Sequence, residues 1–110
     1  MFRISENEIQ ITRGDTGRVE LDITQTDGKP YERQHGDIVT FTVKKSTSDI
    51  TPIIQKLVGE SNAFTIEPAD TENLDYGPYF YDVQLVCASD NSVNTIIVPS
   101  LFIVEEEVTF

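Results

Sequence analysis

Apolar and polar residues alternate with a period of two along most of this chain of 110 residues. Successive side chains of a β-strand point to opposite faces, so this period predicts strands with one buried and one exposed face. Residues 38–45 illustrate the pattern, because Val39, Phe41 and Val43 alternate with polar side chains. This alternation, together with apolar runs at 53–58 and 93–104, predicts strands at residues 8–12, 17–24, 38–45, 53–58, 63–67, 76–88 and 93–104.

Short connections rich in Gly, Asp, Asn and Ser separate the predicted strands. Such residues favour turns, and about seven short antiparallel strands at this spacing predict an all-β sandwich, formed by residues 1–110 as a single domain. One connection differs, because residues 68–74 predict a single helical turn with Asp70 or Thr71 as its cap. Pro99 and Ser100 interrupt the last strand and predict a bulge or bend at that point.

The chain is strongly acidic, since 19 Asp and Glu residues against 8 Lys and Arg residues give a formal net charge of −11. This charge repels phosphate backbones and anionic lipid surfaces, so we expect neither a nucleic-acid nor a membrane partner. No apolar run approaches the roughly 20 residues of a bilayer span. The N-terminus also lacks the apolar stretch of a signal peptide. We therefore expect a protein made in the cytoplasm and stabilised by packing, because a single cysteine forms no internal disulfide.

The residue types that carry catalysis and metal binding are sparse in this chain. His35, the only histidine, lies in a polar loop, and Cys87, the only cysteine, falls in a row predicted to face the core. Zinc needs about four ligands of the His or Cys type. We therefore expect no enzymatic activity, no metal and no cofactor. A ligand-binding module for calcium or carbohydrate, using the loops near Asp15, Asp70 and Asp75, stays open as an alternative function.

The segment of residues 70–83 has a recognisable order of features. A predicted turn is followed by the apolar Leu74, by Gly77 and then by Tyr79 at the start of a strand. This order resembles the turn before strand F of immunoglobulin-like domains, in which a tyrosine corner anchors the loop through its hydroxyl group. The resemblance implies an immunoglobulin-like β-sandwich with a short helical turn before strand F and Tyr79 as the corner residue. The alternative is that Tyr79 is simply an aromatic core residue.

Four segments taken together resemble a family of phage proteins. They are residues 11–17, 36–45, 70–83 and 102–109. With them the chain looks like small prophage proteins of Gram-positive bacteria, and it resembles the N-terminal domain of upper baseplate proteins of siphophages. The resemblance implies a non-enzymatic virion structural or assembly protein of the tail or baseplate, located in the virion after synthesis in the host cytoplasm. The sequence ends at Phe110, without the helical and fibre-like region that follows in those baseplate proteins.

An outward-facing apolar patch is expected independently of that resemblance. If Tyr79 and the residues alternating with it face the core, then Phe80 and Val86 face outward. By the same alternation, Leu101 and Ile103 face outward on the last strand. Strands F and G pair in such sandwiches, so these four side chains are predicted to form a protein interface. The expected partner is a second copy, giving a homo-oligomer, or another virion protein.

Two alternatives to this interface stay open. The bend at Pro99 could shift the register of the last strand, which would turn Leu101 and Ile103 toward the core. The segment around Phe2 and Ile4 could also fold over the patch and cover it.

Overall fold

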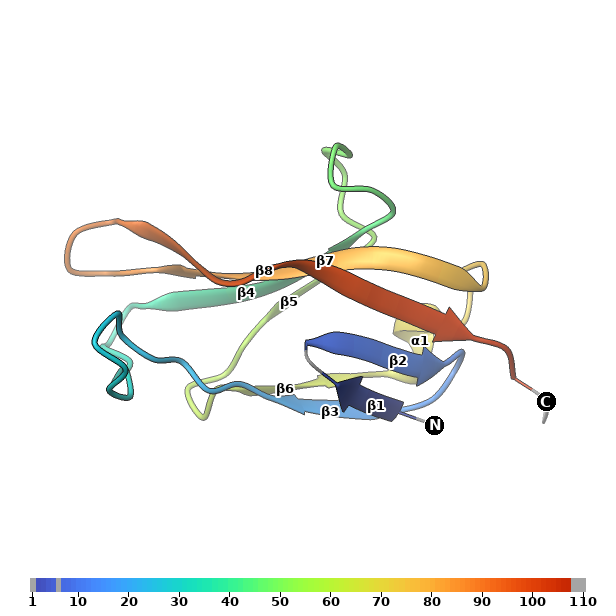
Figure 1. The fold of residues 1–110 in the computed structure, drawn as a ribbon, viewed down its shortest axis with the longest axis horizontal. Helices are drawn as coiled ribbons and strands as arrows, with labels where there is room; N and C mark the ends of the chain where they lie inside the picture. Colours follow the sequence, from blue (N-terminus) through green and yellow to red (C-terminus); the bar gives the residue numbers. More distant parts are fainter. Residues whose placement is uncertain (1, 6, 108–110) are drawn as a thin grey trace.

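The computed structural model describes residues 2–5 and 7–107, and residues 2–5 are described by their backbone alone. It is mostly β-structure with one short helix (Figure 1). The elements are β1 (Phe2–Ser5), β2 (Glu8–Thr12), β3 (Gly17–Glu20), β4 (Ile38–Lys44), β5 (Ile54–Leu57), β6 (Ala63–Ile66), α1 (Pro68–Thr71), β7 (Gly77–Val86) and β8 (Val93–Glu105).

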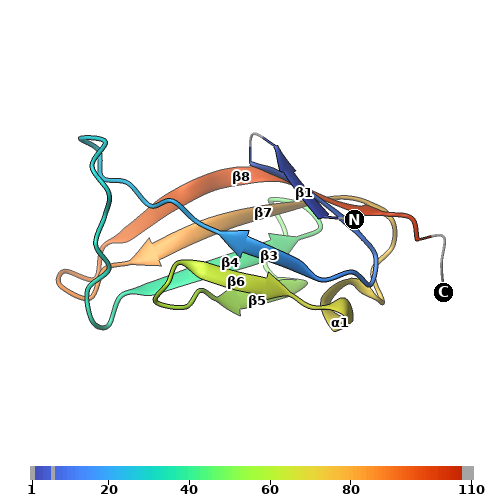
Figure 2. The same ribbon diagram turned by 90° about the horizontal axis from the view of Figure 1, so that it is seen from below.

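The strands form a six-stranded sheet in the order β1-β2-β8-β7-β4-β5 and a two-stranded sheet of β3 and β6. Both views show β3, β6 and α1 on one side of the large sheet, with β1 and β2 curling toward that side (Figures 1 and 2). The predicted all-β character is confirmed. The prediction of seven antiparallel strands is wrong in two respects, because β1 was not predicted and β2 pairs with β8 in parallel.

The first strand escaped prediction because it is short and borders a polar turn. β1 has four residues and pairs antiparallel with β2, and Asn7, just before β2, takes a positive φ of 69°. A strand of this length shows little periodicity. Because β1 lies beside β2 at the rim of the sheet, it does not cover the outward residues of β7.

The predicted strand at residues 17–24 is split in the structure. β3 ends at Glu20, although alternation continues and Ile23 is buried. After Leu21 the chain folds back on itself, and the Tyr31 amide donates to the Ile23 carbonyl at 2.9 Å. The alternation of buried and exposed side chains that begins in β3 therefore continues past Glu20, the last residue that pairs with β6.

The core lies between the two sheets, and aromatic rings occupy its centre. Phe41 is fully buried, and its ring centroid lies 4.5 Å from that of Phe64, 5.4 Å from that of Tyr81 and 6.2 Å from that of Phe102. These distances fall in the range of favourable tilted aromatic pairs. The predicted inward row of residues 76–88 is confirmed for Tyr79, Tyr81, Val83 and Leu85, which are buried, whereas Cys87, its last member, follows β7 and is only partly buried.

The predicted helical turn exists, but its capping residue is a different one. α1 begins after Glu67, whose backbone amide donates to the Asp70 carboxylate at 2.7 Å. Thr71 does not cap the helix, because its side chain is buried and its Oγ1 accepts a hydrogen bond of 2.9 Å from the Gly14 amide. The Thr71 hydroxyl, which the sequence predicted as a helix cap, therefore makes a long-range contact with Gly14 instead.

The predicted irregularity at Pro99 and Ser100 is confirmed. Tyr81 pairs with Ser100 but Val83 pairs with Ile97, so β8 carries an extra residue in this interval. Beyond it the ladder is regular again, and Phe80 pairs with Leu101. The bulge therefore does not turn Leu101 away from the outer face.

Candidate functional site

The outer face of the large sheet is the face that points away from β3 and β6. Among the described residues, only the connection between β4 and β5 stands on this side of the sheet (Figure 1). Every other described layer packs on the inner face. The outward side chains of β4, β7 and β8 are therefore available for contacts that the described part of the fold does not make.

Three large apolar side chains meet on this face and form what we call the apolar patch: Phe80, Leu101 and Ile103. Phe80 lies directly opposite Leu101 in the β7–β8 ladder, and Ile103 lies two residues further along β8, opposite Pro78. Each of the three is partly exposed, whereas their neighbours Tyr79 and Phe102 are buried. The predicted residues Phe80, Leu101 and Ile103 are thus brought together.

Val86 is not brought together with the other three residues. It lies six residues from Phe80 along β7, which corresponds to about 20 Å of strand. Its cross-strand neighbours are Ile38 on β4 and Val93 on β8, exposed by 50% and 62%. Ile38, Val86 and Val93 form a second apolar row at the far end of the sheet. Ile38 could have been found from the sequence, because alternation with the inward Val39 places it outward.

Charge is sparse on the outer face between these two apolar clusters. Lys44 and Asp82 carry the only charges among the outward residues of β4, β5 and β7, and residues 93–103 of β8 carry none. Lys44 lies opposite Phe80, and Asp82 lies opposite Thr42. Acidic residues begin on the β2 side of the apolar patch, because Glu8 on β2 and Glu105 on β8 alternate with buried residues and therefore also face outward. A protein surface could approach the area between the two apolar clusters without meeting concentrated negative charge.

A groove of about 270 Å³ adjoins the apolar patch. The β4–β5 connection forms one wall with Ile50 and Pro52, and Phe80, Asp82 and Gln84 belong to its lining on the sheet. Phe80 thus belongs to both the patch and the groove. No sequence pattern predicted this groove, because it depends on the path of the β4–β5 connection above the sheet.

Tyr79 lies at the start of β7 and points into the core side of the sheet. Its hydroxyl donates to the Asp75 carbonyl at 2.8 Å, a bond to the backbone a few residues upstream. Burial raises the pKa of Tyr79, and the nearby charge of Asp75 adds to the effect. The bond ties the α1–β7 connection to the strand that carries Phe80.

A second polar network lies around Asp37, at the end of the sheet opposite the apolar patch. Its carboxylate accepts from the Ala88 amide at 2.8 Å, from the Gln34 amide at 2.9 Å and from the Tyr31 hydroxyl. These bonds hold the pKa of Asp37 below its usual value, the Ala88 amide contributing most. The same carboxylate raises the pKa of Tyr31. The network joins the β3–β4 connection to the turn between β7 and β8.

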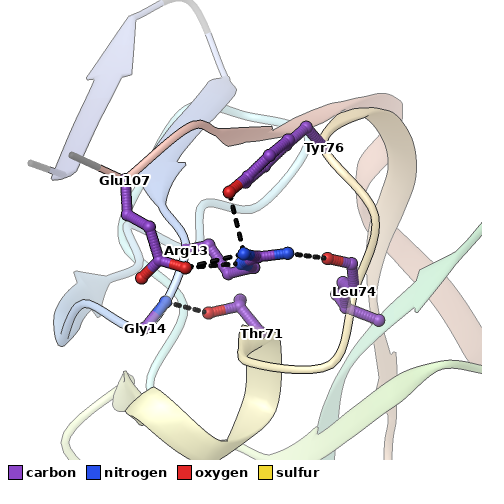
Figure 3. A network of polar contacts seen from close by, with 6 residues as sticks. All are labelled: Arg13, Gly14, Thr71, Leu74, Tyr76 and Glu107. Atoms are coloured by element: carbon purple, nitrogen blue, oxygen red, sulfur yellow. Dashed lines mark hydrogen bonds and ion pairs between the residues drawn. The ribbon is translucent and has the colours of Figure 1, made fainter. Parts of the chain in front are cut away.

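A third network, around Arg13 in the β2–β3 connection, reaches the last described residue, Glu107 (Figure 3). The guanidinium donates to Glu107 Oε1 at 2.7 and 3.0 Å, to the Leu74 carbonyl at 3.3 Å and to the Tyr76 hydroxyl at 2.8 Å. The β2–β3 connection, the α1–β7 connection and the segment that follows β8 are therefore fixed to one another. Glu107 belongs to an acidic run that the sequence alone presents as a solvated tail.

The residues considered for catalysis and metal binding lie apart from the apolar patch. His35 is exposed in the β3–β4 connection, and Cys87 is partly buried, with its Sγ 3.8 Å from the Tyr31 hydroxyl and 3.5 Å from Asn94 Nδ2. Asp70 pairs with Lys56 Nζ at 2.7 Å. Within residues 2–5 and 7–107, no three His, Cys, Asp or Glu side chains come together as a metal site.

Comparison with known proteins adds no family to this description. None of the helices in the described part of the chain is long and apolar enough to cross a membrane. No protein-family model matches the chain, and no curated protein matches it.

Proposed function

We propose that this chain is a non-enzymatic structural or assembly protein of a phage or prophage virion, associated with the tail or baseplate. In this proposal it has an immunoglobulin-like fold and binds neighbouring virion proteins through the outer face of its large sheet. The observation that carries the proposal is the apolar patch, in which Phe80 and Leu101 are paired across two strands on a face that no described layer covers. Exposed apolar patches of this kind commonly mark protein interfaces.

The strand order supports the immunoglobulin-like part of the proposal. The run β8-β7-β4-β5 corresponds to strands G, F, C and C′ of a variable-type domain, and the pair β3-β6 corresponds to strands B and E. The hydrogen bond from Tyr79 to the Asp75 carbonyl corresponds to the tyrosine corner at the start of strand F. β1 and the parallel β2–β8 pair are additions to that comparison.

The charge distribution supports docking of a protein rather than of a nucleic acid. Between the two apolar clusters the outer face carries Lys44 and Asp82, which offset each other, and the chain as a whole is acidic. A polyanion needs clusters of Lys and Arg. An apolar protein surface needs only a face from which concentrated charge is absent. The virion part of the proposal is supported by the sequence resemblance.

Replacing Ile103 by lysine and measuring how much of the chain enters virus particles tests this function. In a strain that carries the gene in a prophage, Ile103→Lys should leave the domain folded but remove the chain from purified induced particles, as measured by quantitative mass spectrometry. Thr16→Lys is the matched control, because it adds the same charge at an exposed turn before β3. It should be incorporated as the wild type is.

Two results would contradict the proposal, and they concern different parts of it. Absence of the wild-type chain from particles would overturn the virion role. Normal incorporation of a folded Ile103→Lys chain would overturn the role of the outer face. A rise in melting temperature with calcium or with a glycan panel would instead favour the ligand-binding alternative, since a ligand that binds only the folded chain stabilises it.

A further inference from the structure

The strand β5 forms one rim of the large sheet, and its free edge is separate from the apolar patch. β5 pairs with β4 on one side and is the last strand of the sheet in that direction. Figure 2 shows it at the outer margin of the molecule. From this edge we infer that two copies of the chain associate by pairing their β5 strands, which joins their large sheets into one continuous sheet.

The backbone of β5 offers hydrogen-bonding groups to a second strand. The Val58 amide donates to the Val39 carbonyl of β4 at 2.8 Å. In an antiparallel ladder alternate residues bond to the same side, so Ile54 and Lys56 also direct their backbone groups toward β4. Gln55 and Leu57 then direct their N–H and C=O groups toward the rim. Each copy thus contributes two donors and two acceptors, as pairing of one strand with another requires.

The side chains along this edge are apolar and unusually exposed. Leu57 is 75% exposed, and Ile53, just before the strand, is 38% exposed. Both are branched aliphatic residues of the kind that packs well across paired strands. Burial of Leu57 against the neighbouring strand would remove from water a side chain that the described fold leaves uncovered.

One common protection against edge pairing, an unpaired inward charge, is absent here. Natural edge strands often carry an inward-pointing charge, which a docking strand would bury without a partner. β5 has one charged residue, Lys56, but its Nζ already lies 2.7 Å from the Asp70 carboxylate. A second strand at the rim therefore leaves no new charge unpaired.

The absence of acidic residues along β5 allows a second copy of this acidic chain to be the occupant. Residues 50–58 contain no Asp or Glu, although the chain holds 19 acidic residues in 110. Two copies that met through most other surfaces would bring acidic groups together, whereas two β5 edges meet without that repulsion. A twofold axis between antiparallel β5 strands also gives the closed, self-complementary contact that is commonest among soluble homo-oligomers.

Solution mass and amide exchange test this inference on the full chain. Light scattering over a concentration series should show twice the mass of one chain for the wild type. Leu57→Lys should raise the dimer dissociation constant by about tenfold or more, and Ile103→Lys should leave it unchanged. Hydrogen exchange of the wild type should show protection of the Gln55 and Leu57 amides that grows with concentration. The Ile54 and Lys56 amides should be protected at all concentrations.

The outcomes separate this inference from the proposed function. A single-chain mass at every soluble concentration would overturn it, and so would a dimer in which the Gln55 and Leu57 amides exchange freely. A dimer that survives in Leu57→Lys but dissociates in Ile103→Lys would place self-association on the outer face instead. Circular dichroism checks that Leu57→Lys is folded, and wild-type exchange decides the question alone if that variant is not.

Discussion

The inner and outer faces of the large sheet are built from the same strands but carry different kinds of contact. On β7, the inward Tyr79 and Tyr81 are buried, while Phe80 between them is partly exposed and belongs to the apolar patch. The inward Tyr81 ring lies 5.4 Å from the Phe41 ring on the neighbouring strand β4, and the outward Phe80 lies opposite Leu101 on β8. One strand therefore stabilises the fold with alternate residues and presents a surface for a partner with the others.

The largest expected difference between the faces is in stability. Phe41→Ala removes a fully buried ring that lies within 6.2 Å of three other aromatic rings. The free energy of unfolding should fall by about 3–5 kcal/mol. Phe80→Ala removes the same group from the outer face and should cost about 1 kcal/mol or less. Chemical denaturation measures both values, and equal losses would mean that the faces do not differ as described.

The next expected effect concerns Asp37, at the end of the core near the β7–β8 turn, and the way it makes the stability of the fold depend on pH. The pKa of Asp37 is lowered in the folded chain, so its ionised carboxylate stabilises the fold above the ordinary Asp pKa of about 3.9. This contribution is lost as the pH falls through the folded-state pKa. Asp37→Asn should therefore be less stable than the wild type near neutral pH, and the difference should shrink in acid.

Thermal melting of both chains from neutral pH to below pH 4 measures that difference. A constant gap between wild type and Asp37→Asn across the whole range would show that ionisation of Asp37 is not its source. The wild-type melting curves at neutral pH are the reference for both series.

A smaller effect is expected at the tyrosine that begins β7. Tyr79→Phe removes the bond to the Asp75 carbonyl and keeps the buried ring. The expected loss is about 1 kcal/mol, the typical net value of one hydrogen bond. Hydrogen exchange should become faster in the α1–β7 connection and stay unchanged in β4. Unchanged exchange in residues 72–77 would show that the hydroxyl does not hold this connection.

The sequence predicts which face of each strand is buried more reliably than it predicts which strands lie side by side. Alternation in β7 identifies Tyr81 and Val83 as inward and Phe80 as outward, because the period depends only on backbone geometry. It does not say which strand lies alongside, so the parallel β2–β8 pair was not foreseen. The bond between Arg13 and Glu107 joins residues 94 positions apart, and no local pattern contains it.

Prediction of the candidate site was limited in the same way. Phe80, Leu101 and Ile103 were grouped correctly on the outer face because β7 and β8 are consecutive strands that pair directly. Val86 was grouped with them on the basis of its face alone, although six residues of strand separate it from Phe80 by about 20 Å. Its actual neighbours, Ile38 and Val93, depend on where β4 and β8 lie against the end of β7.

Contact of the outer face with another protein is the central claim, and site-specific cross-linking in assembled particles tests it most directly. A photoreactive phenylalanine analogue at Phe80 should form a covalent product with another virion protein, and the same analogue at the exposed Thr16 should form none. That result would identify the neighbour as well as the face. Folded, incorporated chains that give no product from position 80 but a strong product from position 16 would contradict the claim.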